Sequence, residues 1–320
     1  MIRKTLILMG SIALAAVMTV TACTTGTTTA IETESRKALK EEITTAPHQV
    51  NVGSLWDSEL FDEERFMMNI RLNQAERREA KRLSRSFTVH MQKSELLMHY
   101  LLSELKKRNL PIELAAVPLL ESGFNPRAVS PAGAQGLWQF TRPTGKTLGL
   151  QRSRGYDDFY DIIKSTDASL RFLEHLYNEF GSWDIALVAY NQGEYGIKKA
   201  VSRVRGRGAK YVSVKNLPIS GHARQYLRHF RIYAELIRNP KDYGAKLPEI
   251  KNRPAFKSIN VAGKISSMRE VANITGANIK DLKHLNAGYT SDRISNARHQ
   301  VLLVPIENAH ALESAIGIAK

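Results

Sequence analysis

The apolar residues of this chain recur at helical spacing over most of its middle. A predicted helix at about 93–108 has one apolar face and a basic last turn. That face consists of Leu97, Met98, Leu101, Leu102 and Leu105. Residues 165–180, with Ser165 or Thr166 as the N-cap, and residues 222–237 follow the same pattern. Since no convincing strand pattern appears between 58 and 240, the sequence predicts an all-α domain there.

Another predicted helix leads to an unusual glutamate. Pro111 opens it at the favoured first position, and Gly123 is a plausible stop. Pro118 lies inside it and is expected to favour a kink, because it removes one backbone hydrogen bond. The apolar stretch "LAAVPLL" (114–120) runs directly into Glu121, although carboxylates are rarely buried unless they are paired.

Two physical effects act on Glu121 at this position. The C-terminal end of a helix disfavours negative charge, and apolar neighbours raise the pKa of a carboxyl group by desolvation. Both effects favour the protonated acid at neutral pH, which is the form that a general acid for glycosidic bond cleavage needs. Position alone is more typical of a glutamate turned towards solvent at a helix end.

The rest of the pattern places loops and a second module. Residues 127–150 are rich in Gly, Pro and Ser, which predicts a loop with a short helix. A buried helix at 183–193 precedes a basic, glycine-containing loop at 202–210. After residue 254 the order becomes strand, helix, helix, strand, which predicts a small separate module at 250–310.

The first residues have the pattern of an export signal. Arg3 and Lys4 precede the apolar segment 5–20, and a small residue stands immediately before Cys23. An ordinary membrane anchor is the alternative, but the segment is short for a membrane span. "VTAC" (20–23) resembles the lipobox of bacterial lipoproteins, which implies a signal peptide at 1–22 and lipidation of Cys23. The Thr-rich residues 23–55 are then a flexible tether.

Charge and composition narrow the chemistry. The 320-residue chain has 46 Lys and Arg against 31 Asp and Glu, so its formal charge of +15 indicates an anionic partner. An exported protein is not expected to meet DNA. The single cysteine excludes an intramolecular disulfide, a zinc ribbon and, since lipidation accounts for it, a cysteine nucleophile. No metal-site or cofactor motif appears, so carboxylates, hydroxyls and amides are the expected chemical groups, without cofactor or metal.

Two blocks of sequence resemble one enzyme family. "LLESGFNPRAVSPAGAQGLWQF" (119–140) and "ALVAYNQGEYGI" (186–197) are similar to the signature of the soluble-lytic-transglycosylase (SLT) domain, and the similarity covers about 90–238. The resemblance implies a lysozyme-like all-α catalytic domain, here placed at 56–245. It also implies peptidoglycan glycan strands as substrate. The implied reaction is non-hydrolytic cleavage of the MurNAc–GlcNAc bond, which closes a 1,6-anhydro ring.

The resemblance also implies site residues. Glu121 would be the only acid/base, in contrast to the usual pair of glycosidase carboxylates. Ser122 would position the acid or an N-acetyl group, and Gln139 would hydrogen-bond substrate. The remaining site residues would be Tyr190, Asn191 and Tyr226, although core packing explains the two tyrosines equally well. His222 departs from the family, which usually has a second acid at this position.

The C-terminal module has two interpretations. "MREVANITGANIKDLKHLN" (268–286) fits a helix-turn-helix, which together with positive charge suggests DNA binding. The flanking strands favour a βααβ unit that resembles a LysM repeat, either a glycan binder or a packing module. The complete prediction is a mainly α, lipid-anchored envelope protein, on the periplasmic face of the outer membrane since Thr24 is not an aspartate. A hydrolytic muramidase and a non-catalytic peptidoglycan-binding lipoprotein stay open as alternatives.

Overall fold

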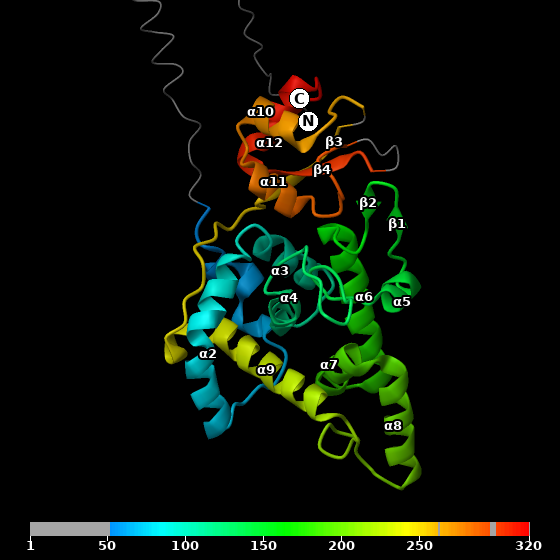
Figure 1. The fold of residues 1–320 in the computed structure, drawn as a ribbon. Helices are drawn as coiled ribbons and strands as arrows, with labels where there is room; N and C mark the ends of the chain where they lie inside the picture. Colours follow the sequence, from blue (N-terminus) through cyan, green and yellow to red (C-terminus); the bar gives the residue numbers. More distant parts are fainter. Residues whose placement is uncertain (1–51, 262, 295–298, 320) are drawn as a thin grey trace, which may run out of the picture. The chain divides into compact units, whose positions relative to one another are not determined.

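The computed structural model describes residues 52–261, 263–294 and 299–319, and from Val52 onward the chain forms one compact unit (Figure 1). The predicted signal peptide (1–22), Cys23 and the tether up to residue 51 lie outside the described residues. Within the described ranges, no helix is both long enough and apolar enough to cross a membrane.

Three single-turn 3₁₀ helices begin the described chain: η1 (Leu55–Asp57), η2 (Glu59–Phe61) and η3 (Glu63–Arg65). Each begins at a side-chain cap, formed by Ser54, Ser58 and Asp62 respectively. Leu55 is fully buried, and its N–H donates to the carbonyl of Ile250 at 2.8 Å. This segment is therefore part of the folded domain.

Helices α2 (Gln74–Gln92) and α3 (Met98–Lys107) follow, and α2 starts with a capping box between Asn73 and Glu76. The predicted helix at 93–108 is wrong over its first residues, because residues 93–97 are turns and the helix begins at Met98. The fully buried Ser94 favours the turn, since its hydroxyl donates to the carbonyl of Met91 at 2.7 Å. The predicted apolar face is buried from residue 97 onward.

The helix before Glu121 is divided into η4 (Ile112–Ala115) and α4 (Ala116–Ser122). Gly123 ends α4 in the left-handed conformation with φ of 59°, as predicted. Pro118 lies in the first turn of α4, where a backbone N–H has no partner within the helix, so its ring removes no hydrogen bond of α4, and the expected kink stays a prediction.

The middle of the chain contains α5 (Arg142–Thr147), the hairpin β1 (Arg152–Ser153) and β2 (Tyr156–Asp157), α6 (Ile162–Phe180) and α7 (Trp183–Gln192). The hairpin was not expected. It pairs with the C-terminal module, because the N–H of Asp157 donates to the carbonyl of Gly288 at 2.8 Å. Asp161 caps α6 instead of Ser165 or Thr166, both of which are buried.

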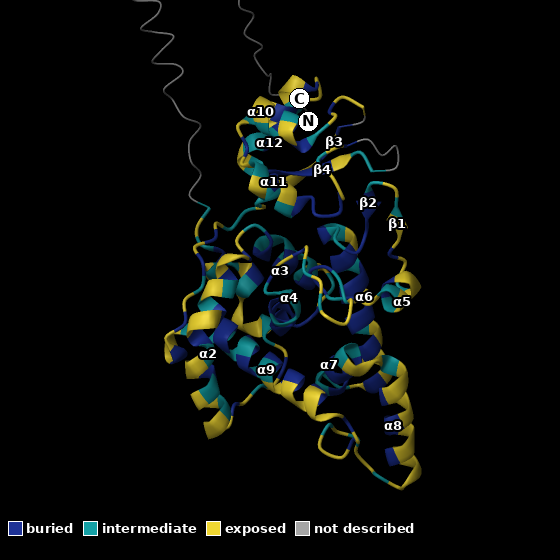
Figure 2. Ribbon diagram, in the orientation of Figure 1, coloured by how far each residue is buried: buried dark blue, intermediate teal, exposed yellow. Residues whose placement is uncertain are grey.

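The predicted basic loop at 202–210 is mostly helix, since α8 spans Glu194–Gly206. Its buried apolar residues Ile197, Val201 and Val204 recur at helical spacing, while Arg203 and Arg205 face solvent. Helix α9 (Gly221–Arg238) confirms the predicted last long helix, and η5 (Pro240–Tyr243) follows. Figure 2 shows buried residues along the inner faces of α6, α7 and α9, where the core of the all-α domain lies.

The C-terminal module has the predicted βααβ order: β3 (Phe256–Asn260), α10 (Met268–Thr275), α11 (Ile279–Leu285) and β4 (Val301–Pro305). The strands are antiparallel, with Ile259 opposite Leu302. A helix that was not predicted, α12 (Ile306–Ala315), follows β4. The described chain is therefore mainly α with a small α+β module, which confirms the predicted fold class.

Candidate active site

A cleft of about 570 Å³ brings together residues that are far apart in the sequence. They come from the end of α4, the loop before α5, and helices α6, α7 and α9. Of the predicted site residues, the cleft is lined by Glu121, Gln139, Tyr190 and Asn191. Tyr226 reaches the cleft through a hydrogen bond to Glu121. The hydroxyl of Ser122 instead donates to backbone carbonyl groups.

Glu121 stands half-buried at the end of α4. Burial raises the pKa of its carboxyl group to about 7, and the hydrogen bond from Tyr226 opposes this rise. The Tyr226 hydroxyl donates to Oε1 at 2.8 Å. At neutral pH the side chain is therefore protonated in a large fraction of molecules. Glu121 is also the only acidic side chain among the described residues that line the cleft.

Ser122 and Gly123 hold the end of α4, and with it Glu121, in one conformation. The Ser122 hydroxyl lies 3.0 Å from the carbonyl oxygen of Pro118 and 2.8 Å from that of Leu137, so it joins α4 to the facing loop. A side chain at Gly123 would lie 3.2 Å from the ring of His90 and would be strained by the positive φ. The "ESG" sequence thus fixes the direction of the acid.

Gln139 belongs to a tightly folded loop. Its Nε2 donates to the carbonyls of Gly136 at 2.8 Å and Ala128 at 3.2 Å, and its own φ is 52°. Gly136 is required here, because a Cβ would lie 1.9 Å from the carbonyl oxygen of Phe159. These contacts hold the wall of the cleft opposite α7 in one shape.

Tyr190 and Asn191 end the facing helix, α7. The Tyr190 hydroxyl donates to the carbonyl of Trp138 at 2.8 Å, and burial raises its pKa well above its usual value. The Oδ1 atom of Asn191 is buried, and no described residue hydrogen-bonds it. An unsatisfied buried acceptor is costly, so this amide is suited to an N–H group of a ligand.

Aromatic rings form one side of the cleft, and two of them, Phe140 and Phe172, were missed in the sequence. Each of three rings packs against the other two, with centroids 5.8–6.5 Å apart: those of Phe140, Phe172 and Tyr190. Phe140 directly follows Gln139 in the motif, so its position was a usable signal. Phe172 had no such signal, because its helical spacing resembles that of any core residue.

Comparison with known families agrees with this geometry. The family described as "Transglycosylase SLT domain" matches residues 101–213, which include Glu121, Gln139 and Asn191. This part of the chain belongs to the SLT family. Residues 255–316 match "Lytic transglycosylase MltD, LysM-like domain", which confirms the LysM-like interpretation of the C-terminal module.

Curated relatives of the SLT domain include several lytic transglycosylases. Over 225 residues the chain is 32% identical to membrane-bound lytic murein transglycosylase D of Escherichia coli K12, covering 70% of this chain and 49% of that protein. It is 34% identical over 130 residues to membrane-bound lytic murein transglycosylase F of Idiomarina loihiensis, covering 37% and 27%. The peptidoglycan transglycosylase gp16 of Escherichia phage T7 is 29% identical over 179 residues, covering 53% and 13%. The chain thus spans about half the length, or less, of these relatives.

His222 lies beyond the matched residues 101–213 and lines the cleft at the start of α9, in the place where the family resemblance predicts a second acid. Its side chain is exposed. No other acidic residue of the described chain replaces that acid in the cleft lining. Glu121 is therefore the one carboxyl group in the described lining of the cleft.

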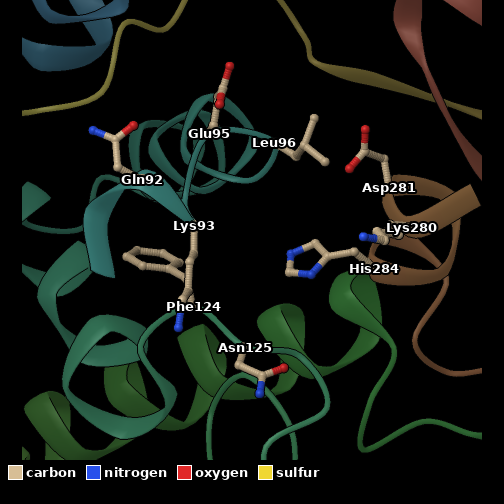
Figure 3. A pocket seen from close by; sticks show the side chains of 9 residues that line it. All are labelled: Gln92, Lys93, Glu95, Leu96, Phe124, Asn125, Lys280, Asp281 and His284. Atoms are coloured by element: carbon tan, nitrogen blue, oxygen red, sulfur yellow. The ribbon is translucent and has the colours of Figure 1, made fainter. Parts of the chain in front are cut away.

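A second cavity of about 540 Å³ lies beyond Phe124 and Asn125, which follow the end of α4 (Figure 3). Lys280, Asp281 and His284 of α11 form its other side. Positive and negative side chains balance there, and burial lowers the pKa of His284, which favours the neutral ring. The cavity contains none of the predicted site residues.

Proposed function

We propose that the SLT domain of this chain cleaves the bond between N-acetylmuramic acid and N-acetylglucosamine in peptidoglycan without using water. The observation that carries this proposal is Glu121. It is a half-buried acid with a pKa of about 7, faces the cleft, and has no second acidic side chain beside it among the described lining residues. A usual glycosidase needs two carboxyl groups.

The reaction uses Glu121 twice. Its carboxyl group first donates a proton to the glycosidic oxygen, and the bond from that oxygen to the anomeric carbon breaks. The carboxylate then takes the proton of the 6-hydroxyl of the same muramic acid. The 6-oxygen forms a bond to the anomeric carbon, which closes the 1,6-anhydro ring. The enzyme regains its proton, and no water is consumed.

Neighbouring residues position the acid and the sugar. Tyr226 orients Glu121 through the hydrogen bond to Oε1, and Ser122 holds the helix end that carries the acid. The buried Oδ1 of Asn191 accepts the N–H of an N-acetyl group. Phe140 and Phe172 offer apolar contact to a sugar ring, while Gln139 and Tyr190 hold the two walls of the cleft.

We further propose that Cys23 anchors the protein to a membrane of the bacterial envelope, on the periplasmic face of the outer membrane. The support is the "VTAC" sequence and the names of relatives that are described as membrane-bound. Labelling cells with a radioactive fatty acid tests this: the wild-type protein incorporates label and Cys23→Ala does not. Equal labelling of both proteins would contradict the lipid anchor.

Mass spectrometry of digested peptidoglycan tests the reaction. Purified wild-type protein is expected to release 1,6-anhydromuropeptides, and Glu121→Gln is not. Products with a reducing end would instead support a hydrolytic muramidase on the same fold. Intact peptidoglycan with both proteins would support the third candidate, a non-catalytic peptidoglycan-binding protein, which the exposed His222 in the cleft favours.

A further inference from the structure

A basic pocket of about 410 Å³ lies between α2 and α9, outside the catalytic cleft. We call it the arginine pocket. It is lined by Glu79, Arg82, Arg224, Gln225, Arg228 and His229. Three arginines and one histidine thus surround a single carboxylate, so the pocket has a net positive charge.

Glu79 organises the cations of the arginine pocket. Its oxygens lie 3.0 Å from Nη2 of Arg82, 2.5 Å from Nη2 of Arg228 and 3.4 Å from Nε2 of His229. Burial alone would raise the pKa of Glu79, but Arg228 and His229 outweigh burial and hold it below its usual value. Each guanidinium has five N–H donors, more than one shared carboxylate can accept.

The opposite side of the pocket is also held in place. Nη1 and Nη2 of Arg224 donate to the carbonyls of Val214 and Leu217, each at 3.2 Å. The side chains of Arg82 and Arg228 are 74% and 43% exposed, while that of Glu79 is only 13% exposed. The acid is therefore largely covered, and the cations above it face solvent.

One face of α9 connects the arginine pocket to the cleft. His222 lines the cleft, whereas Gln225 and His229 line the pocket. These residues are spaced three and four apart, so they lie along one helix face. At 1.5 Å per residue, His222 and His229 are about 10 Å apart along the axis. A glycan strand that leaves the cleft along α9 therefore passes over the arginine pocket.

We propose that the arginine pocket binds free carboxylates of the peptide stems carried by the glycan strand in the cleft. This proposal rests on the proposed function, because it assumes a peptidoglycan strand as substrate. Guanidinium groups pair with carboxylates through two parallel hydrogen bonds, which suits a fixed anion beside the strand. The pocket then selects strands that still carry peptides.

Binding measurements test the arginine pocket directly. The mature protein with Glu121→Gln, which stops turnover, is titrated with peptide-bearing glycan strands and with the same strands after amidation of their carboxyl groups. Adding Arg228→Gln is expected to weaken binding to untreated strands about twofold to fivefold, as for one exposed ion pair. It should leave binding to amidated strands unchanged. Arg228→Lys should retain most of the affinity, and Arg205→Gln, on the exposed face of α8, is the matched control.

Several outcomes would overturn the proposal. Equal weakening on both kinds of strand would show that Arg228 only clamps α9 to α2, and no weakening would show that the pocket is unused. Sensitivity that persists on peptide-free strands, which keep only the lactyl carboxylate, would move the ligand from the peptide to the sugar. If Arg228→Gln unfolds, the exposed Arg82→Gln replaces it, with the same expected results.

The proposed function is tested separately. If the wild-type protein cleaves neither kind of strand while carboxylate-dependent binding persists, the catalytic proposal fails and the arginine pocket stands. If anhydro products form, but adding Arg228→Gln to the Glu121→Gln protein changes binding to neither kind of strand, the catalytic proposal stands and the arginine pocket fails.

Discussion

Two glutamates eight residues apart on the same segment show what separates a structural acid from a candidate catalyst. Glu113, in η4, is 2% exposed, and its Oε1 accepts the N–H of Met68 at 2.7 Å. Glu121, at the end of α4, is half-buried, bonded by the Tyr226 hydroxyl and open to the cleft. Burial raises the pKa of both groups. A raised pKa therefore does not identify the acid, and access to a ligand does.

The largest expected effect is a difference in cleavage rate between substitutions at Glu121 and at Glu113. Glu121→Gln should reduce the release of muropeptides about 10²–10⁴-fold, because it removes the proton donor while keeping the shape. Glu113→Gln should change the rate little, since Glu113 is outside the cleft lining. The rates are measured by chromatography of released products. A large loss in Glu113→Gln with an unchanged melting temperature would break the comparison.

The next effect is a difference in the free energy of unfolding between substitutions at Glu113 and at Glu121. Glu113→Ala leaves the N–H of Met68 without its acceptor, and should lower the free energy of unfolding by about 1–3 kcal/mol. Glu113→Gln keeps an acceptor oxygen and should lose less. Urea unfolding followed by circular dichroism measures both. The distinction would fail if Glu121→Ala proved as destabilising as Glu113→Ala.

Asn191 extends the comparison to amides. Asn191→Ala should weaken substrate binding up to about tenfold, the contribution of one hydrogen bond, without lowering the melting temperature, because its Oδ1 has no described partner. Asn286→Ala is the control. Its amide accepts the N–H of Leu303 at 2.9 Å and donates to two carbonyls, so this substitution should lower the melting temperature. The reverse order of melting temperatures would contradict the interpretation of Asn191 as a ligand-binding residue.

The smallest effect is a shift in pH dependence. Glu121 holds its proton below a pKa of about 7, so the rate should fall as pH rises through that value. The Tyr226 hydrogen bond lowers this pKa, and Tyr226→Phe should therefore move the alkaline limb of the plot of cleavage rate against pH to higher pH. Tyr243→Phe, which breaks a tyrosine–glutamate hydrogen bond away from the cleft, should not move it. A limb that stays or moves to lower pH in Tyr226→Phe would contradict the assigned contact.

Local sequence patterns predicted more of the site than of the fold's details. Glu121, Gly123 and Gln139 lie in one continuous motif, so their order already indicated a helix end facing a loop. The last residues of α8, 202–206, were mistaken for a loop, because the arginines and the terminal glycine outweighed the apolar spacing of Val201 and Val204.

The distinction between the two glutamates could not be predicted. The burial of Glu113 depends on Met68, which is 45 residues away in the sequence. The missing partner of Asn191 likewise depends on how α7 packs, and no local pattern records it. The arginine pocket has the same origin, because Glu79 meets Arg228 only when α2 packs against α9.

Titration of the side-chain carboxyl groups by ¹³C NMR tests the central difference most directly. Protein labelled at glutamate is compared with Glu121→Gln, and the signal that disappears belongs to Glu121. We expect that signal to titrate near pH 7, because burial raises its pKa to about that value. A midpoint near the ordinary value of 4.5 would mean that Glu121 is ionised at neutral pH, and would contradict its assignment as the acid.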